Sequence, residues 1–214
     1  MRGRNAKMKH FRRIAAVAIA IALFISPMPI SNAQSESLGL NPLTEVIDLG
    51  NRKFDTTAGD FDIFTAVYID TWAARGKSPL RVLSDGNVKL TAFVPTDAAF
   101  RKLVKDLTGK KLSSERAVAN AVMSLGAKTV EQVLLYHVVL GEPVLSPAAL
   151  AANGAQLTTA QGESFGVQVS GTTITLVDKS DNTRNPVVLL PLVDINKGNN
   201  QVAHGINRVL LPTL

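Results

Sequence analysis

The sequence predicts an α+β fold in which helices pack on a largely antiparallel β-sheet. Two observations carry this prediction. In the first half of the chain after position 41, apolar residues mostly recur every three to four positions, which is the period of an amphipathic helix. From Ala155 onward they mostly alternate with polar residues, which is the period of a strand. This separation of helices from strands is typical of α+β domains rather than of repeated βα units.

Capping residues place the helices before the first strand. Asn41-Pro42 opens a short helix, and Asp60 can cap a second helix, which Gly76 stops. The second helix carries an apolar stripe with a 3.6-residue period, made up of Phe61, Phe64, Val67, Tyr68 and Trp72.

The middle of the chain is predicted to hold a strand followed by three helices. Leu90–Val94 has the composition of a buried strand and ends at Pro95. Thr96 can cap the next helix, and Ser113 starts another. Thr129–Gln132 fits a capping box for the third, because the Thr and Gln side chains can each satisfy a free backbone amide.

The second half is predicted to consist mainly of strands. Apolar residues alternate over Phe165–Val169 and continue over Ile174–Val177, on either side of a Ser170-Gly171 turn. Two dense apolar runs, Pro186–Val193 and Val209–Leu211, are interpreted as further strands.

The positive charge of the chain is confined to its beginning. The 214 residues carry a net charge of +6, but residues 1–34 hold six basic residues and no acidic one. The rest holds 17 basic and 17 acidic residues, so its net charge is zero. Bulk electrostatics therefore gives no reason to expect nucleic acid as a partner. The absence of cysteine excludes disulfides, thiolate metal sites and a cysteine nucleophile.

The first 33 residues have the order of a secretory signal peptide. The basic segment is followed by the apolar run Ile14–Ile25, which gives about 18 Å of helix, too short for about 30 Å of hydrocarbon. Ser31-Asn32-Ala33 then places small residues before a cleavage point. We expect residues 1–33 to be cleaved, residues 34–40 to be a flexible lead-in and residues 41–214 to form one domain. The exported protein is then expected to have no stable membrane insertion.

Three segments together resemble the fasciclin domain family. The opening box is Thr91–Phe100, the central Tyr-His box is Leu134–Val139 and the closing box is Asn200–Pro212. Their order and spacing are also similar to those of the family, and the resemblance covers about Asn41 to Pro212. The closing box departs from the usual pattern at three positions, which are occupied by Gln201, Gly205 and Asn207.

The resemblance implies a fasciclin-like fold, a β-sheet sandwich or wedge with helices packed on it. It also implies a secreted, non-catalytic module for adhesion or binding, located outside the cell, either free or retained non-covalently at the cell wall. The expected partner is a cell-surface or matrix protein or a glycan, with no cofactor, no metal and no nucleic acid. The family's association of the Tyr-His region with recognition makes Tyr136 and His137 candidate binding residues. The other motif residues are expected to be structural: Thr91, Phe93, Pro95, Thr96, Asp97, Phe100, His204, Leu210, Leu211 and Pro212.

Physical reasoning adds a specific hypothesis for His137. Both the opening and the central box carry a polar residue beside apolar runs, where an unpaired polar group is costly. A hydrogen bond between His137 and Asp97 is therefore expected to join the two boxes. A structural role for His137, satisfied by a carboxylate or backbone group, remains an alternative to the recognition role.

Two other functions stay open from the sequence. Gly162–Gly166 matches the Gly-x-Ser-x-Gly pattern of serine hydrolases with Ser164 as nucleophile, followed by acidic residues and His204. That pattern requires a strand before the serine and a helix after it, whereas strands are predicted here, so hydrolase activity is disfavoured. A carrier of a small apolar ligand is the other alternative, with Val187–Leu192 and Ala148–Ala152 expected to line a groove.

Overall fold

The computed structural model describes residues 37–47, 53–181 and 183–213. The predicted signal peptide lies outside the described residues. Within them, none of the helices has the length and apolar character needed to cross a membrane.

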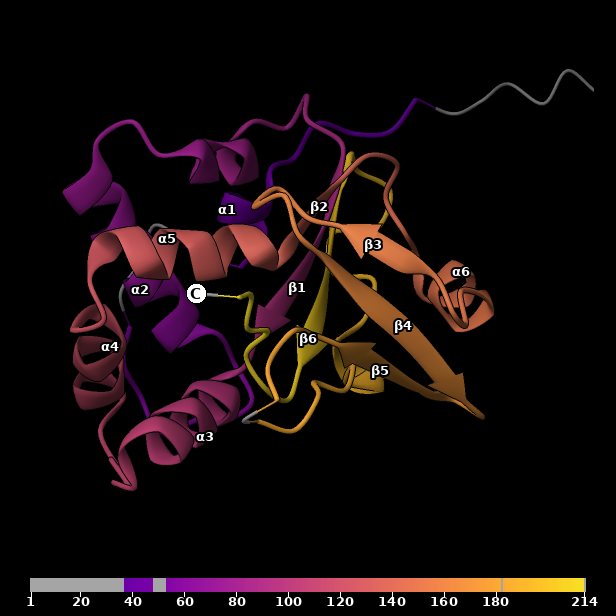
Figure 1. The fold of residues 1–214 in the computed structure, drawn as a ribbon. Coiled ribbons are helices and arrows are strands. Elements are labelled where there is room, and N and C mark those ends of the chain that lie inside the picture. The colour runs from indigo at the N-terminus through magenta and orange to yellow at the C-terminus, as the bar shows by residue number, and fades with distance from the viewer. Residues whose placement is uncertain (1–36, 48–52, 182, 214) are drawn as a thin grey trace, which may run out of the picture. The chain divides into compact units, whose positions relative to one another are not determined.

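Helices dominate the first half of the described chain and strands the second, as Figure 1 shows. The helices are α1 (Leu43–Val46), α2 (Asp62–Arg75), α3 (Asp97–Thr108), α4 (Glu115–Met123), α5 (Ala127–Tyr136) and α6 (Ser146–Ala151), with 3₁₀ helices η1 (Pro79–Ser84) and η2 (Leu190–Leu192). The strands are β1 (Leu90–Pro95), β2 (Val138–Leu140), β3 (Gln156–Thr158), β4 (Ser164–Ser170), β5 (Thr173–Val177) and β6 (Gln201–Ile206).

The strands form two three-stranded sheets, ordered β2-β1-β6 and β3-β4-β5. All pairs are antiparallel except β1 and β6, which run parallel in a register from Leu90 opposite Gln201 to Pro95 opposite Ile206. In Figure 1, β1 and β6 lie between helices α2–α5 on one side and β3, β4 and β5 on the other. The predicted α+β fold, with helices on mostly antiparallel sheets, is confirmed.

Strand β1 separates two apolar cores because its side chains alternate between its faces. Leu90, Ala92 and Val94 belong to the core shared with the helices. Phe93 points the other way, into a second core shared with Phe165 and other residues of the β3-β4-β5 sheet. Every residue of β1 is buried, which explains why its sequence is an almost continuous apolar run.

Helices α3 and α5 do not begin with the side-chain caps expected for them. Helix α5 begins at Ala127 after Gly126, so the expected capping box at Thr129–Gln132 is wrong. Thr96 is the N-cap of α3, as predicted, but its side chain makes no capping bond. The first amides of α3 instead donate to the carbonyls of Asp60 (from Asp97, 3.0 Å) and Ala58 (from Ala98, 2.9 Å). Carbonyl groups that are distant in sequence therefore accept from the free amides at the start of α3, where the sequence predicts a side-chain cap.

Both apolar runs expected to be the last strands are irregular. Pro186–Val193 makes two isolated bridges and then turns into η2, where Pro191 has no amide to donate to a ladder. Val209–Leu211 lies outside any strand. The amides of Leu210 and Leu211 donate to side chains, at His137 Nε2 (2.9 Å) and Asp178 Oδ2 (2.8 Å).

Two other expectations concern the lead-in and an apolar groove. Residues 34–36 of the expected lead-in lie outside the described residues, while Gly39 donates a backbone hydrogen bond to Gly198 (2.8 Å) and accepts one from Asn200 (2.9 Å). The groove expected to be lined by Val187–Leu192 and Ala148–Ala152 stays a prediction. Members of both segments, including Val188 and Leu150, pack on the second core.

Two unusual residues of the closing box, Gln201 and Asn207, have hydrogen-bond partners that are distant in sequence. The buried Gln201 amide donates to the carbonyls of Val82 (2.8 Å) and Asp85 (2.7 Å), and its oxygen accepts from the Leu43 amide. Asn207 Oδ1 accepts from the Val187 amide at 2.8 Å. These contacts join the closing box to α1, to η1 and the residue after it, and to the segment before η2.

Gly205 is required by close packing against η2. A Cβ atom at this position would lie 2.6 Å from Leu192 Cβ and 2.9 Å from Leu192 Cδ1. We predict that Gly205→Ala destabilises the protein by about 1–3 kcal/mol because the added methyl group overpacks this contact. Gly59→Ala is the matched control, since a Cβ there meets no atom within 4 Å. Urea unfolding of both variants measures the difference, and equal midpoints would contradict the prediction.

Candidate functional site

The three sequence boxes meet around the end of helix α5. Strands β1 and β6, from the opening and closing boxes, lie side by side. The central box runs from α5 into β2, which pairs with the other edge of β1. Residues far apart in the sequence therefore surround Tyr136 and His137.

His137 connects three parts of the chain through its ring and its backbone. Its Nδ1 lies 2.7 Å from the Val133 carbonyl in α5, and its Nε2 lies 2.9 Å from the Leu210 amide nitrogen. Its own carbonyl accepts from the Phe93 amide of β1 at 2.9 Å. A carbonyl can only accept and an amide can only donate, so the ring must be neutral with its proton on Nδ1. Burial lowers the pKa of His137 to about 4.

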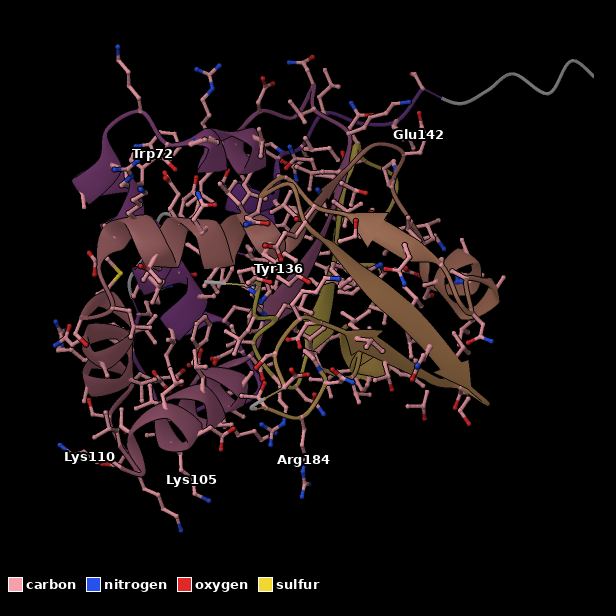
Figure 2. All side chains as sticks on the ribbon, in the orientation of Figure 1. Trp72, Lys105, Lys110, Tyr136, Glu142 and Arg184 are labelled. Carbon is pink, nitrogen blue, oxygen red and sulfur yellow. The ribbon has the colours of Figure 1, made fainter. Side chains whose placement is uncertain are left out.

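Tyr136 lies in the second core, beside the aromatic residues of the sheets. Its ring packs edge-on against Phe165 at 5.9 Å, and Phe165 contacts Phe93 in the same way at 5.4 Å. Its hydroxyl donates to the Ser164 carbonyl at 3.2 Å. Figure 2 shows Tyr136 in the middle of the domain. Tyr136 and His137 are 0% and 1% exposed, so neither side chain reaches a partner in this structure, and their recognition role stays a prediction.

Asp97 does not contact His137, so the expected hydrogen bond between them is wrong. Its Oδ1 accepts from the Ile63 amide of α2 at 2.9 Å, while its buried Oδ2 has no hydrogen-bond donor. Burial is the main cause that raises the Asp97 pKa to about 8, and the negative charges of Asp60 and Glu115 add to it. Asp97 therefore joins α3 to α2 from a site that disfavours its ionised form.

Acidic side chains that could hold a metal gather around Asp97. Oxygen atoms of Asp60, Asp62 and Asp97 lie within 4.8 Å of one another, as do those of Asp55, Asp62 and Glu115. Carboxylate oxygen is the ligand type that calcium and magnesium accept. The charge of Glu115 is met by Arg101 at 2.8 Å. The absence of a metal stays a prediction.

Ser164 and His204 are not arranged as a nucleophile and its base. The Ser164 hydroxyl is 3.0 Å from that of Thr158, and Ser164 begins a strand rather than a strand-to-helix turn. Both ring nitrogens of His204 face the backbone: Nε2 donates to the Val144 carbonyl (2.7 Å), and Nδ1 accepts from the Asp194 amide (3.2 Å). The sequence pattern around Ser164 therefore lacks the geometry of a hydrolase.

Most residues expected to be structural are buried at the junctions of the fold. Thr91 Oγ1 accepts from the Val144 amide at 2.8 Å, after strand β2. The largely apolar members Phe93, Pro95, Phe100, Leu210 and Pro212 are buried.

Sequence reasoning missed two polar side chains that fix loops. Asp178 receives the Leu211 amide, and Asp194 receives both the amide and the hydroxyl of Ser146 at 2.7 Å. Each lies in a loop beside apolar residues, and the sequence alone did not single out either role.

Comparison with known proteins agrees with this architecture. The model of the fasciclin domain matches residues 68–212, which is more than half of the chain and includes all three boxes. The chain belongs to the fasciclin domain family. It is also similar to a solved FAS1 domain pair from the insect cell adhesion molecule Fasciclin I, with 15% sequence identity and a TM-score of 0.48. That match covers 73% of this chain and 48% of the domain pair, so the chain spans about half the length of the domain pair. No curated protein matches the chain.

Because His137 is neutral in the folded protein, its contribution to the stability of the fold should be lost in acid. The folded pKa of about 4 lies below the ordinary value of 6.5, so the unfolded chain binds more protons between these pH values. The His137 contribution is complete above pH 6.5 and is lost as the pH falls towards 4. We predict that the stability advantage of wild type over His137→Gln shrinks by about 3 kcal/mol between pH 7 and pH 4. Urea unfolding of both proteins measures it, and a constant difference would contradict the neutral ring.

The raised pKa of Asp97 predicts the opposite dependence of stability on pH. Its folded pKa of about 8 lies above the ordinary value of 3.8, so the folded state binds the extra proton and stability falls as the pH rises towards 8. Asp97→Asn keeps an acceptor for the Ile63 amide and carries no charge. We predict that wild type loses about 1–2 kcal/mol between pH 6.5 and 8 and that Asp97→Asn does not.

The control for this prediction is Asp97→Ala, which leaves the Ile63 amide without its acceptor. It should be less stable than Asp97→Asn by about 1–3 kcal/mol at every pH, because neither variant carries a titrating group at this position. Parallel pH profiles of wild type and Asp97→Asn would show that Asp97 is ionised at neutral pH.

Proposed function

We propose that the protein is a secreted, non-catalytic binding module that acts at cell surfaces or in the extracellular matrix. The observation that carries this proposal is the fasciclin domain match over residues 68–212. The chemistry of the described residues supports it, because Ser164 and the two described histidines are engaged in internal hydrogen bonds.

Export accounts for the uneven charge of the chain. Residues 1–33 act as a signal peptide, and residues 34–214 form the working protein, which is secreted or held non-covalently at the cell wall. With 17 basic and 17 acidic residues after position 34, that form is neutral. Its partner is a cell-surface or matrix protein or a glycan, bound through shape and specific contacts rather than net charge.

The buried position of Tyr136 and His137 restricts how the central box can meet a partner. Both residues are covered, but the same segment continues into β2, where Leu140 is 50% exposed. A partner that recognises this region contacts the exposed end of β2, and the Tyr-His pair fixes the position of that strand from inside.

A binding experiment with exported protein tests this proposal. Its mass should correspond to a chain beginning at Gln34, and immobilised protein should bind a surface extract of the producing cells saturably, with competition by free protein. Binding should change less than threefold between 50 and 300 mM salt, because few counterions are released. A chain beginning at Met1, or binding that does not saturate, would contradict the proposal.

Two matched variants locate the contact. Leu140→Asp should weaken binding at least fivefold, because it places a charge on the exposed end of β2. Leu190→Asp is the control, since Leu190 is similarly exposed at 45% but lies in η2. Equal binding by both variants would place the partner contact elsewhere on the domain.

A further inference from the structure

An apolar cavity of about 190 Å³ lies within the helical half of the domain. Helices α3, α4 and α5 and the segment after β6 contribute to its wall, and Figure 1 shows these helices on one side of β1 and β6. Thirteen residues line the cavity, and eleven of them are apolar. They include Phe100 and Leu103 of α3, Val122 of α4, Val130 and Val133 of α5, and Val209.

The protein interior leaves this volume unfilled. Folded proteins pack as densely as organic crystals and contain few voids larger than a water molecule. A void of this size deprives the wall of van der Waals contacts on one side. An occupant that restores these contacts would stabilise the folded state.

Water is a poor occupant of this cavity. A buried water needs two to four polar partners, and the lining offers only Thr129 and His137 as polar residues. Both ring nitrogens of His137 are already used, by the Val133 carbonyl and the Leu210 amide. A charged or strongly polar molecule would lose its hydration without finding replacement hydrogen bonds.

The cavity has a way in for an apolar molecule. Leu107 and Leu125 both line it and are 53% and 46% exposed, which places them at its mouth. An engineered apolar cavity of about 150 Å³ stays dry and binds benzene. A volume of 190 Å³ therefore suits a molecule with one or two rings or a branched chain of similar size.

We propose that this cavity is a binding site for a small, neutral, apolar molecule of one or two rings. This activity is independent of partner binding at the surface. It also differs in place from the groove expected from the sequence, because the wall is made by the helices and not by residues 148–152 or 187–192. Val209 and Leu211 in the wall flank Leu210, so an occupied cavity holds the last segment against His137.

Toluene is the probe that tests the site. Saturating toluene should raise the melting temperature of the exported protein by at least 2 °C, since a ligand that binds only the folded state stabilises it. Benzoate, which is similar in size but charged, should have no effect at the same concentration. Equal shifts with both compounds, or no shift with toluene, would overturn the proposal.

Two Val→Phe variants show whether toluene raises the melting temperature by binding in this cavity. Val133→Phe should fill the cavity from a half-buried position on α5 and reduce the toluene shift at least fivefold. Val46→Phe adds the same ring at a residue of α1 that is 39% exposed and does not line the cavity, so it should respond like wild type. A full response in Val133→Phe would place toluene elsewhere.

Methyl NMR of the wild-type protein gives a test that does not depend on the folding of a variant. Toluene should shift the methyl signals of Leu103, Val122 and Val130, which line the cavity. Those of Val167 and Leu176 in the second core should not move. Shifts confined to the second core, or no shifts at all, would overturn the site.

Discussion

The fold depends on one buried imidazole that must stay neutral. His137 donates from Nδ1 to the Val133 carbonyl, accepts at Nε2 from the Leu210 amide and offers its carbonyl to Phe93. These three bonds join helix α5, the final segment and strand β1, which are distant in sequence. A second proton on the ring would place an N–H against the Leu210 N–H, so one protonation would disrupt the connection between three elements.

This connection positions both apolar cores. Strand β1, fixed by His137 on one edge and by β6 on the other, directs alternate side chains towards the helices and towards the second sheet. The segment that bonds to His137 also completes the wall of the helical cavity through Val209 and Leu211. A structural histidine therefore links the sequence box predicted to serve recognition with a cavity suited to an apolar molecule.

The sequence predicts the helices and strands that follow from local periodicity. It does not predict the hydrogen bonds that form between residues distant in sequence. The helices of the first half and the strands β1, β4 and β5 follow from periodicity. Thr129 looked like a capping residue, but the helix begins earlier, at Ala127. The run Val209–Leu211 looked like a strand, but its amides go to His137 and Asp178. His137 was correctly expected to need a polar partner, and only the folded chain shows that backbone groups, not Asp97, supply it.

Determining which ring nitrogen of His137 carries the proton tests the role of this residue most directly. Long-range ¹H–¹⁵N NMR at pH 7 distinguishes a protonated ring nitrogen from an unprotonated one. The structure predicts a neutral His137 with the proton on Nδ1, and the opposite tautomer for His204, whose Nε2 donates to Val144. A doubly protonated His137, or one protonated at Nε2, would contradict the connection on which the fold depends.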